Sequence, residues 1–253
     1  QITFYSGFYG KAEREVLNWK KGAQPNFSGI QFSHSQRMGN FDIVIGMNGH
    51  TDAGYRMNDS RQRVGMNINT RYRSKKFEGL NYGINVNGAY RVSEPYIIWR
   101  NAPDSVYYST IGFNSVNKNT AVNFDPYITY YKGNTKHSLK GRYFYIKNET
   151  RAGINNDETL YYGEYQLQKT YDKGLTWSSG ASFSRGMTIS EIYGKSKRAT
   201  NSSSLFTQLD QKYKNWTFSL GGRLELYNFN DDVDIVDSLV GDTKKLAKFF
   251  ENV

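Results

Sequence analysis

Apolar and polar residues alternate one by one through most of this sequence, and the alternation recurs in segment after segment. In residues 63–73, one parity holds Val64, Met66, Ile68 and Tyr72, and the other parity holds only glycine, asparagine and arginine. The same period of two returns at 80–90, 175–184 and 216–226. Because successive side chains of a strand point to opposite faces of a sheet, this period predicts amphipathic β-strands.

The length and polarity of these segments distinguish them from the strands of a soluble sandwich. They run for about 10–14 residues, whereas soluble strands usually have about 5–6 and tilted membrane-spanning strands need about 9–11. Their polar parity suits a water-filled lumen. With the opening segment Ile2–Tyr9, the two segments on either side of Met38–Asn40, and less regular segments at 121–131, 140–146, 160–169 and 205–213, the sequence predicts roughly eleven strands.

The connections between the predicted strands alternate between short and long. Short turns fall at Met38–Asn40, Ser74–Gly79, Gly133–Lys136, Asp172–Gly174 and Lys214–Asn215. Longer polar loops fall between them, at Gly10–Asn26, Thr51–Ser60, Ser93–Thr120, Asn148–Glu158 and Ile189–Asn201. Outer-membrane barrels join their strands by tight periplasmic turns and long extracellular loops, so this sorting of loop lengths predicts such a barrel.

Aromatic residues make up 16% of the chain and include 21 tyrosines, although the mean hydropathy is only −0.72. No stretch approaches the roughly 18 consecutive apolar residues of a membrane helix, which excludes a helical membrane protein. Several aromatic residues lie within about three positions of a short turn, as in the girdle of a barrel. They are Phe41, Tyr72, Tyr82, Tyr130, Tyr171, Trp177, Tyr213 and Trp216.

The predicted fold is therefore all-β, an antiparallel transmembrane β-barrel. Bacterial single-chain barrels have even strand numbers, so an odd count predicts about half of a larger barrel. The sequence begins at Gln1 without a signal peptide, and we expect it to be a piece of a longer protein. Residues 1–230 form barrel strands and loops in this prediction, and residues 231–253 form a loop or a short amphipathic helical tail.

Several of these segments together resemble the early barrel strands of TonB-dependent receptors from Bacteroidota. The similarity lies in the runs Phe27–Gln36, Gly39–Ile45, Asp52–Arg56, Arg63–Arg73 and Gly79–Ala89. The opening run Ile2–Tyr9 resembles the first barrel strand, which directly follows the plug domain in that family. The resemblance covers residues 1–230.

The resemblance implies an active transporter of the outer membrane, with roughly 22 strands around a plugged lumen. Energy reaches such receptors from the inner membrane through TonB, which pulls on a motif ahead of the plug. This sequence contains no plug domain, no TonB-binding motif and no second half of the barrel with its aromatic C-terminus. The resemblance therefore implies contact with the TonB complex only through a plug region that this sequence lacks.

Other chemistries find little support in the sequence. The net charge of +10 is spread along the chain and not gathered in one patch, which argues against nucleic acid as a partner. There is no cysteine, and His34, His50 and His137 lack metal-ligand spacing. Ser33 and Ser35 flank His34, but adjacent residues of a strand point to opposite faces. We expect no enzyme activity, no bound metal and no cofactor.

Two sets of residues remain as candidates for function. Arginines recur on the polar parity of the strands, where they would pair with plug carboxylates, belong simply to the charged lining of a wide lumen, or attract anionic substrates: Arg63, Arg71, Arg91, Arg142 and Arg223. The long loop Ser93–Thr120 holds aromatic and basic residues suited to an extracellular ligand: Tyr96, Trp99, Arg100, Tyr107 and Tyr108.

Two classes of function fit these features. The first is a TonB-dependent receptor segment in the outer membrane of a Gram-negative bacterium, for uptake of siderophore iron, an oligosaccharide or a similar scarce nutrient. The second is a passive or structural barrel, such as a porin, an adhesin or a component of a surface assembly. The expected partners are outer-membrane lipid, lipopolysaccharide and a surface lipoprotein. A plug-encoding region upstream of Gln1 distinguishes the two classes.

Overall fold

The computed structural model of the 253-residue chain describes residues 1–20, 23–96, 99–101, 103, 105–109, 116–150, 154–194 and 196–231. The tail expected at 231–253 lies outside these residues, apart from Asp231, with which the last strand ends. In the described residues no helix is long and apolar enough to cross a membrane.

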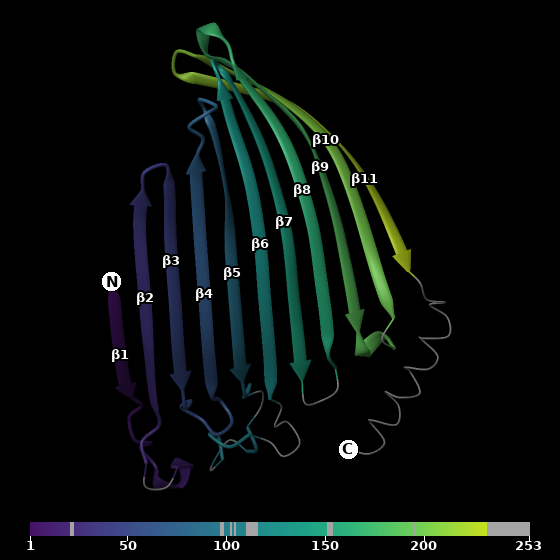
Figure 1. Cartoon of the computed structure of the whole chain (residues 1–253). Coiled ribbons are helices and arrows are strands. Elements are labelled where there is room, and N and C mark those ends of the chain that lie inside the picture. Colours follow the sequence, from purple (N-terminus) through teal and green to yellow (C-terminus); the bar gives the residue numbers. More distant parts are fainter. Residues whose placement is uncertain are drawn as a thin grey trace. The chain divides into compact units, whose positions relative to one another are not determined.

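The described residues form eleven β-strands and three short 3-10 turns (Figure 1). The strands are β1 (Ile2–Phe8), β2 (Asn26–Met38), β3 (Phe41–Asp52), β4 (Arg61–Arg73), β5 (Leu80–Ser93), β6 (Asn117–Lys132), β7 (Thr135–Thr150), β8 (Asn156–Thr170), β9 (Leu175–Ser190), β10 (Lys197–Tyr213) and β11 (Trp216–Asp231). The 3-10 turns are η1 (Glu15–Leu17), η2 (Asp172–Gly174) and η3 (Glu191–Tyr193).

All strands belong to one antiparallel sheet in which the spatial order is the sequence order. The order starts at β1 and ends at β11, so the sheet is open, with these two strands at its edges. The chain divides into two compact units, which are described separately. The first unit comprises Gln1–Tyr72, Gly83–Phe124 and Ile146–Gly153, and the second comprises Arg73–Tyr82, Asp125–Tyr145 and Ile154–Val253.

In the first unit, the register of β1–β4 sorts the side chains onto two faces, because residues paired directly across strands share a face. One face is apolar, with rows that include Phe4, Ile30, Gly49 and Val64, then Ile2, Phe32, Met47 and Met66. The other face is polar, with rows that include Tyr5, Gly29, His50 and Arg63, then Thr3, Gln31, Asn48 and Gly65. The two-residue period of the sequence is thus expressed as a two-faced sheet.

The second unit repeats this division in β8–β11. Its apolar face includes Tyr165, Ala181, Leu205 and Leu224 in one row and Gly163, Phe183, Ser203 and Leu226 in the next. Its polar face includes Glu164, Ser182, Ser204 and Glu225 in one row and Tyr162, Ser184, Ser202 and Tyr227 in the next. Small serines and glycines alternate with charged groups on that polar face.

The sheet encloses almost no apolar side chain of its own. Among the described residues, the buried apolar side chain is Leu17, which lies in η1 outside the sheet. By contrast, Phe4 of β1 and Leu220 of β11 are 73% and 76% exposed. An apolar face of this kind requires apolar surroundings, because removing apolar area from water is what stabilises such side chains.

The short turns use residues that tolerate a left-handed backbone. Gly39, Gly133 and Lys214 have φ values of 60°, 54° and 53°. At Gly79, φ is 81°, and a Cβ atom would lie 2.1 Å from the carbonyl oxygen of Tyr131. Only glycine fits there, because both the backbone conformation and the neighbouring chain exclude a side chain.

The strands extend further into the long connections than the sequence predicts. β7 ends at Thr150 and β8 begins at Asn156, where the sequence predicts a loop over 148–158. β9 continues to Ser190 and β10 begins at Lys197, within the predicted loop 189–201. Those boundaries were wrong because antiparallel pairing satisfies the backbone N–H and C=O groups whatever the side chains are, so a polar strand end needs no alternation.

Candidate functional site

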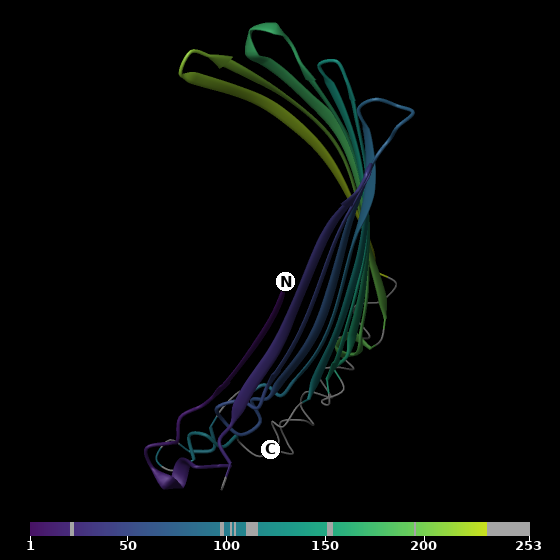
Figure 2. The ribbon, with the colours of Figure 1, turned by 60° about the vertical axis from the view of Figure 1, so that its left-hand side comes forward.

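The connection between β1 and β2 folds back on itself beside the loop that follows β3. Figure 2 shows η1 beyond the ends of these strands. The indole Nε1 of Trp19 donates a hydrogen bond to the backbone oxygen of Tyr55 at 3.0 Å. Asn18 Nδ2 donates to Glu15 Oε1 at 3.2 Å within the connection. Leu17, the last residue of η1, is buried in this connection.

Tyr9 and Asp52 join the ends of β1 and β3. The Tyr9 hydroxyl donates to both Asp52 carboxylate oxygens, at 3.0 and 2.9 Å, and the Gly54 amide donates to Asp52 Oδ1 at 2.8 Å. Burial, together with the hydrogen bond to Asp52, raises the pKa of the Tyr9 phenol. The Tyr9 and Tyr55 rings lie 5.7 Å apart, so this junction also supports the loop between β3 and β4.

A buried carboxylate organises the loop between β3 and β4. Asp59 Oδ2 accepts from Arg56 Nε and Nη2 at 3.2 and 2.9 Å, and Asp59 Oδ1 accepts from Arg61 Nη2 at 3.1 Å. Asp59 is 8% exposed, so its charge is balanced by two guanidinium groups and not by water. The Arg56 guanidinium also lies 4.1 Å above the ring centre of Tyr96, a cation–π contact with the loop after β5.

Tyr96 and Tyr107 tie the loop after β5 to the loop after β3. The Tyr96 hydroxyl donates to the backbone oxygen of Val106, and burial raises the pKa of the Tyr96 phenol against the opposing charge of Arg56. The Tyr55 and Tyr107 hydroxyls share a hydrogen bond of 2.8 Å, and their ring centres lie 4.8 Å apart. This hydrogen bond, followed by burial, raises the pKa of Tyr55.

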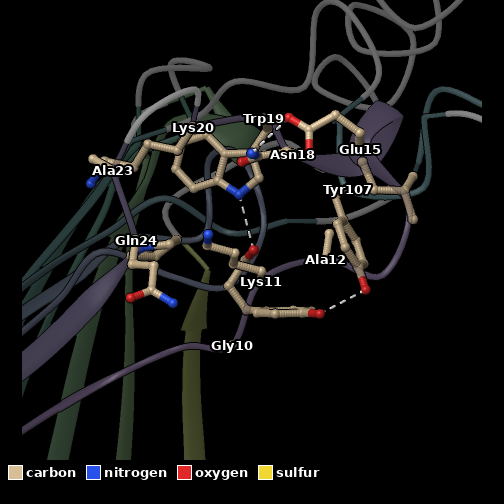
Figure 3. Close-up of a pocket in the computed structure, with 13 residues that line it drawn as sticks. Gly10, Lys11, Ala12, Glu15, Asn18, Trp19, Lys20, Ala23, Gln24 and Tyr107 are labelled. Atoms are coloured by element: carbon tan, nitrogen blue, oxygen red, sulfur yellow. Dashed lines mark hydrogen bonds between the residues drawn. The ribbon is translucent and has the colours of Figure 1, made fainter.

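These three connections enclose a cavity of about 390 Å³ (Figure 3). It is lined by Gly10, Lys11, Ala12, Glu15, Leu17, Asn18, Trp19, Lys20, Ala23, Gln24, Pro25, Tyr55 and Tyr107. Two lysines, a carboxylate and three aromatic rings therefore meet in one recess, which suits a ligand with anionic groups and flat apolar surfaces. Within the described part of the chain, no three His, Asp or Glu side chains are grouped to hold a metal ion.

The loop residues predicted from the sequence to meet a ligand do not all contribute to the cavity. Tyr107 lines the cavity, and Tyr96 secures the loop next to it. Trp99 pairs with Ser109 in an isolated bridge and is 52% exposed. The backbone amide of Arg100 donates to the backbone oxygen of Tyr108 at 3.0 Å, which closes the same small turn. Of these predicted loop residues, Tyr107 is therefore the one that lines the cavity.

Most of the cavity comes from the first long connection, whose chemistry the sequence reasoning missed. Trp19 and Lys20 stand side by side there, with Lys11 on the preceding segment. The tryptophan followed by two lysines in a polar loop, Trp19-Lys20-Lys21, was the available signal. Tyr55 gave no such signal, because its place at the cavity depends on contacts with Trp19 and Tyr107, which are distant in the sequence.

The arginines of the polar parity are mostly paired within the sheet. In the first unit, Asp42 accepts from Arg71 Nη2 at 2.7 Å and lies 3.7 Å from Arg37 Nε. In the second unit, Arg142 forms a two-pronged pair with Asp125, with Nε and Nη2 at 2.7 and 2.9 Å from its oxygens.

Arg223 pairs with Glu225 at 3.1 Å along β11. Among the described residues, no ion pair includes Arg63 or Arg91. Arg63 lies opposite His50, whose Nδ1 is 3.0 Å from the Tyr5 hydroxyl. The five arginines thus divide into three that neighbouring carboxylates satisfy and two that are available to another group.

The serines next to His34 have no catalytic geometry. His34 lies opposite Ile45 on the apolar face, and its Nε2 is 3.4 Å from Gln36 Oε1. Ser33 and Ser35 belong to the other face, opposite Gly46 and Val44. A serine nucleophile needs its base within hydrogen-bond reach, which this arrangement excludes.

The open antiparallel sheet of this chain has the fold of part of the barrel in solved siderophore receptors. The match with the siderophore receptor PirA from Pseudomonas aeruginosa covers 90% of this chain and 37% of the PirA chain, with a TM-score of 0.66 and 9% identity. The ferric-catecholate import receptor Fiu from E. coli K12, in its open form, matches 80% over 43%, with a TM-score of 0.68 and 12% identity. The siderophore receptor PiuA from Acinetobacter baumannii matches 81% over 44%, with a TM-score of 0.58 and 10% identity.

At such identities the likeness concerns the fold alone. The chain spans 37% to 44% of the length of these solved receptors. No protein-family model matches the sequence, and no curated protein matches it either.

Proposed function

We propose that this chain is the barrel segment of a TonB-dependent receptor that imports a scarce nutrient across the outer membrane of a Gram-negative bacterium. The observation that carries the proposal is the open, two-faced antiparallel sheet, which superposes on part of three solved siderophore receptors. Its exposed apolar face matches a lipid-facing wall, and its polar face matches a hydrated lumen. The resemblance of residues 1–230 to Bacteroidota receptors supports the same proposal.

In this proposal the loop cavity of the first unit meets the nutrient. Lys11 and Lys20 would attract anionic groups, and Trp19, Tyr55 and Tyr107 would contact flat surfaces of the ligand. Siderophore iron and acidic oligosaccharides both have this chemistry. Tyr96 and Arg56 position the loop, while Trp99, Arg100 and Tyr108 form its outer turn.

The polar-face arginines serve two purposes in this proposal. Arg71, Arg142 and Arg223 stabilise the wall through the carboxylates beside them. Arg63 and Arg91 remain for carboxylates of a plug domain or for an anionic substrate in transit. TonB would act on the receptor only through the plug region, and the wall itself carries no catalytic role and no cofactor. A surface lipoprotein would be a further partner at the long loops.

The test uses the receptor expressed from its full gene in its own host. We expect outer-membrane location, and nutrient uptake that disappears when TonB is deleted. Uptake that continues without TonB would instead identify a passive barrel, such as a porin. A protein that stays in the outer membrane and contributes to no uptake would identify a structural role.

A further inference from the structure

One arginine of the second unit lies on the apolar face of the sheet. Arg185 of β9 pairs in register with Tyr161 of β8 and with Asn201 of β10. Its parity is that of Phe183 and Met187, which are apolar. The Arg185 side chain is exposed.

Arg185 differs from the polar-face arginines of the same unit. Arg142 and Arg223 each form ion pairs with a carboxylate. In the part of the chain that the structure describes, the Arg185 side chain makes no hydrogen bond and no ion pair. A charged group on a lipid-facing wall is costly at mid-depth and tolerated near the interfaces, so its position along the strand matters.

Arg185 lies near one end of the apolar band, with Met187 and Ile189 as the apolar residues of β9 beyond it. Toward the turn between β8 and β9, the face continues with the rows of Phe183 and Ala181 and reaches Trp177, which pairs with Lys169. Arg185 and Trp177 are about eight residues apart, or roughly 26 Å along a strand at ~3.3 Å per residue. With a strand tilt of about 40°, this corresponds to roughly 20 Å of depth, close to the apolar band of about 25 Å in known barrels.

The neighbours of Arg185 supply further polar groups at the same level. Tyr161 lies beside Tyr143, with ring centres 5.3 Å apart, as an interfacial aromatic pair. Asn201 pairs with Asn228 of β11, so amide groups continue the row. Further out on the same face, Ile189 stands between Asp157 and Lys197, where one charge offsets the other.

We propose that Arg185, together with Tyr161 and Asn201, binds a phosphate of the lipid A headgroup in the outer leaflet. A guanidinium fork matches phosphate oxygens in geometry and charge, and the phenol and amide can donate to the same group. The acyl chains would then cover the apolar rows that begin with Phe183. The proposal rests on the proposed function, which places the apolar face against the outer-membrane lipid and the loops after β7 and β9 at the cell surface.

The experiment measures lipid retained by the full receptor after extraction from outer membranes in a mild detergent. Native mass spectrometry compares phosphorylated lipid A with lipid A from which the phosphates have been removed. We expect R185Q to reduce retention of phosphorylated lipid A at least fivefold and R185K to reduce it less. The control K169Q, which changes a cation on the same face at the other boundary, should retain the wild-type amount.

Equal retention by wild type and R185Q would overturn the proposal, as would wild-type receptor that binds the dephosphorylated lipid equally well. If R185Q fails to give a heat-modifiable barrel, R185K and N201L decide by the same two comparisons. Uptake measurements separate this inference from the proposed function. TonB-dependent uptake without selective lipid A retention would contradict the lipid site alone. Absence of the protein from the outer membrane would contradict both the lipid site and the proposed function.

Discussion

The hydroxyl groups of Tyr55 and Tyr107 share a hydrogen bond of 2.8 Å, although 52 residues separate them in the sequence. The Met57 amide also donates a hydrogen bond of 2.9 Å to the backbone oxygen of Tyr107. Together these contacts hold two long loops against each other at the rim of the cavity. The cavity therefore depends on a side-chain contact that tyrosine makes and phenylalanine cannot.

Replacing Tyr107 by phenylalanine should loosen the loop after β3 without unfolding the sheet. The change removes one hydrogen bond, worth about 0.5–1.5 kcal/mol, and keeps the ring packing. We expect amide exchange at Met57 to accelerate by roughly two- to tenfold, since ~1.4 kcal/mol is a factor of ten. Tyr108→Phe is the matched control, because the described contacts of Tyr108 are made by its backbone. Equal acceleration in both variants would contradict the role of the Tyr107 hydroxyl.

Alkaline pH should release the loops through ionisation of Tyr9. The pKa of Tyr9 is raised in the folded loop by burial and by Asp52, whereas its value in an unfolded loop is about 10. A raised folded pKa means that the stabilisation is complete below pH ~10 and is lost as the pH rises through the folded value. Limited proteolysis between β1 and β4 across this range measures the release.

Tyr9→Phe provides the control for that titration. Phenylalanine cannot ionise, and the Gly54 amide still donates to Asp52 in the variant. We expect its proteolysis to start from a higher baseline and to lack the added rise above pH ~10. An identical rise in both proteins would assign the alkaline transition to another group.

Under the proposed function, replacing Trp19 by alanine should weaken nutrient binding more than replacing Trp99 by alanine. Trp19 lines the cavity and bonds the Tyr55 backbone, whereas Trp99 lies in the outer turn and is 52% exposed. We expect at least about a tenfold rise in Kd for Trp19→Ala, which is ~1.4 kcal/mol, and less than about twofold for Trp99→Ala. Binding to whole cells that express the full receptor is the measurement. The reverse order would move the ligand from the cavity to the turn.

The assignment of the two sheet faces predicts that two arginine substitutions destabilise the folded barrel to different extents. Leu224 pairs with Leu205 on the apolar face and is 62% exposed, whereas Gln208 lies on the polar face opposite Ser178. Leu224→Arg should cost about 2–4 kcal/mol if that face meets lipid at mid-depth, and Gln208→Arg should cost less than about 1 kcal/mol. Folding of the full receptor into lipid vesicles, followed by the heat-dependent gel shift, compares them. Equal losses would show that the faces are misassigned.

The open edges of the sheet predict the behaviour of the 253-residue chain alone. Among the described strands, β1 and β11 each have one neighbouring strand, so each leaves backbone N–H and C=O groups without a sheet partner there. Exposing such groups to hydrocarbon costs several kcal/mol each, and open edges recruit other strands. We expect heterogeneous association in detergent and no heat-modifiable band. A monodisperse monomer with discrete single-channel conductance would instead indicate a small self-sufficient pore.

The alternation of residues determined the two faces of the sheet and the strand count. Val64, Met66 and Ile68 share a face because the side-chain period of a strand is two, whatever the partner strand is. That property is local, and the sequence alone was enough to predict it. The ends of the strands were predicted less well, since at Thr150 or Lys197 backbone pairing continues after the apolar alternation has stopped.

Tertiary structure alone decided which polar groups meet. The pair of Arg71 with Asp42 follows from the register of two strands, and the contact of Tyr55 with Tyr107 follows from the packing of two loops. Such contacts depend on chain segments far apart in sequence, where small shifts in register or loop path change every partner. The position of Arg185 combines both cases, because its parity can be counted in the sequence, while its lack of a carboxylate partner among the described residues appears only in the folded sheet.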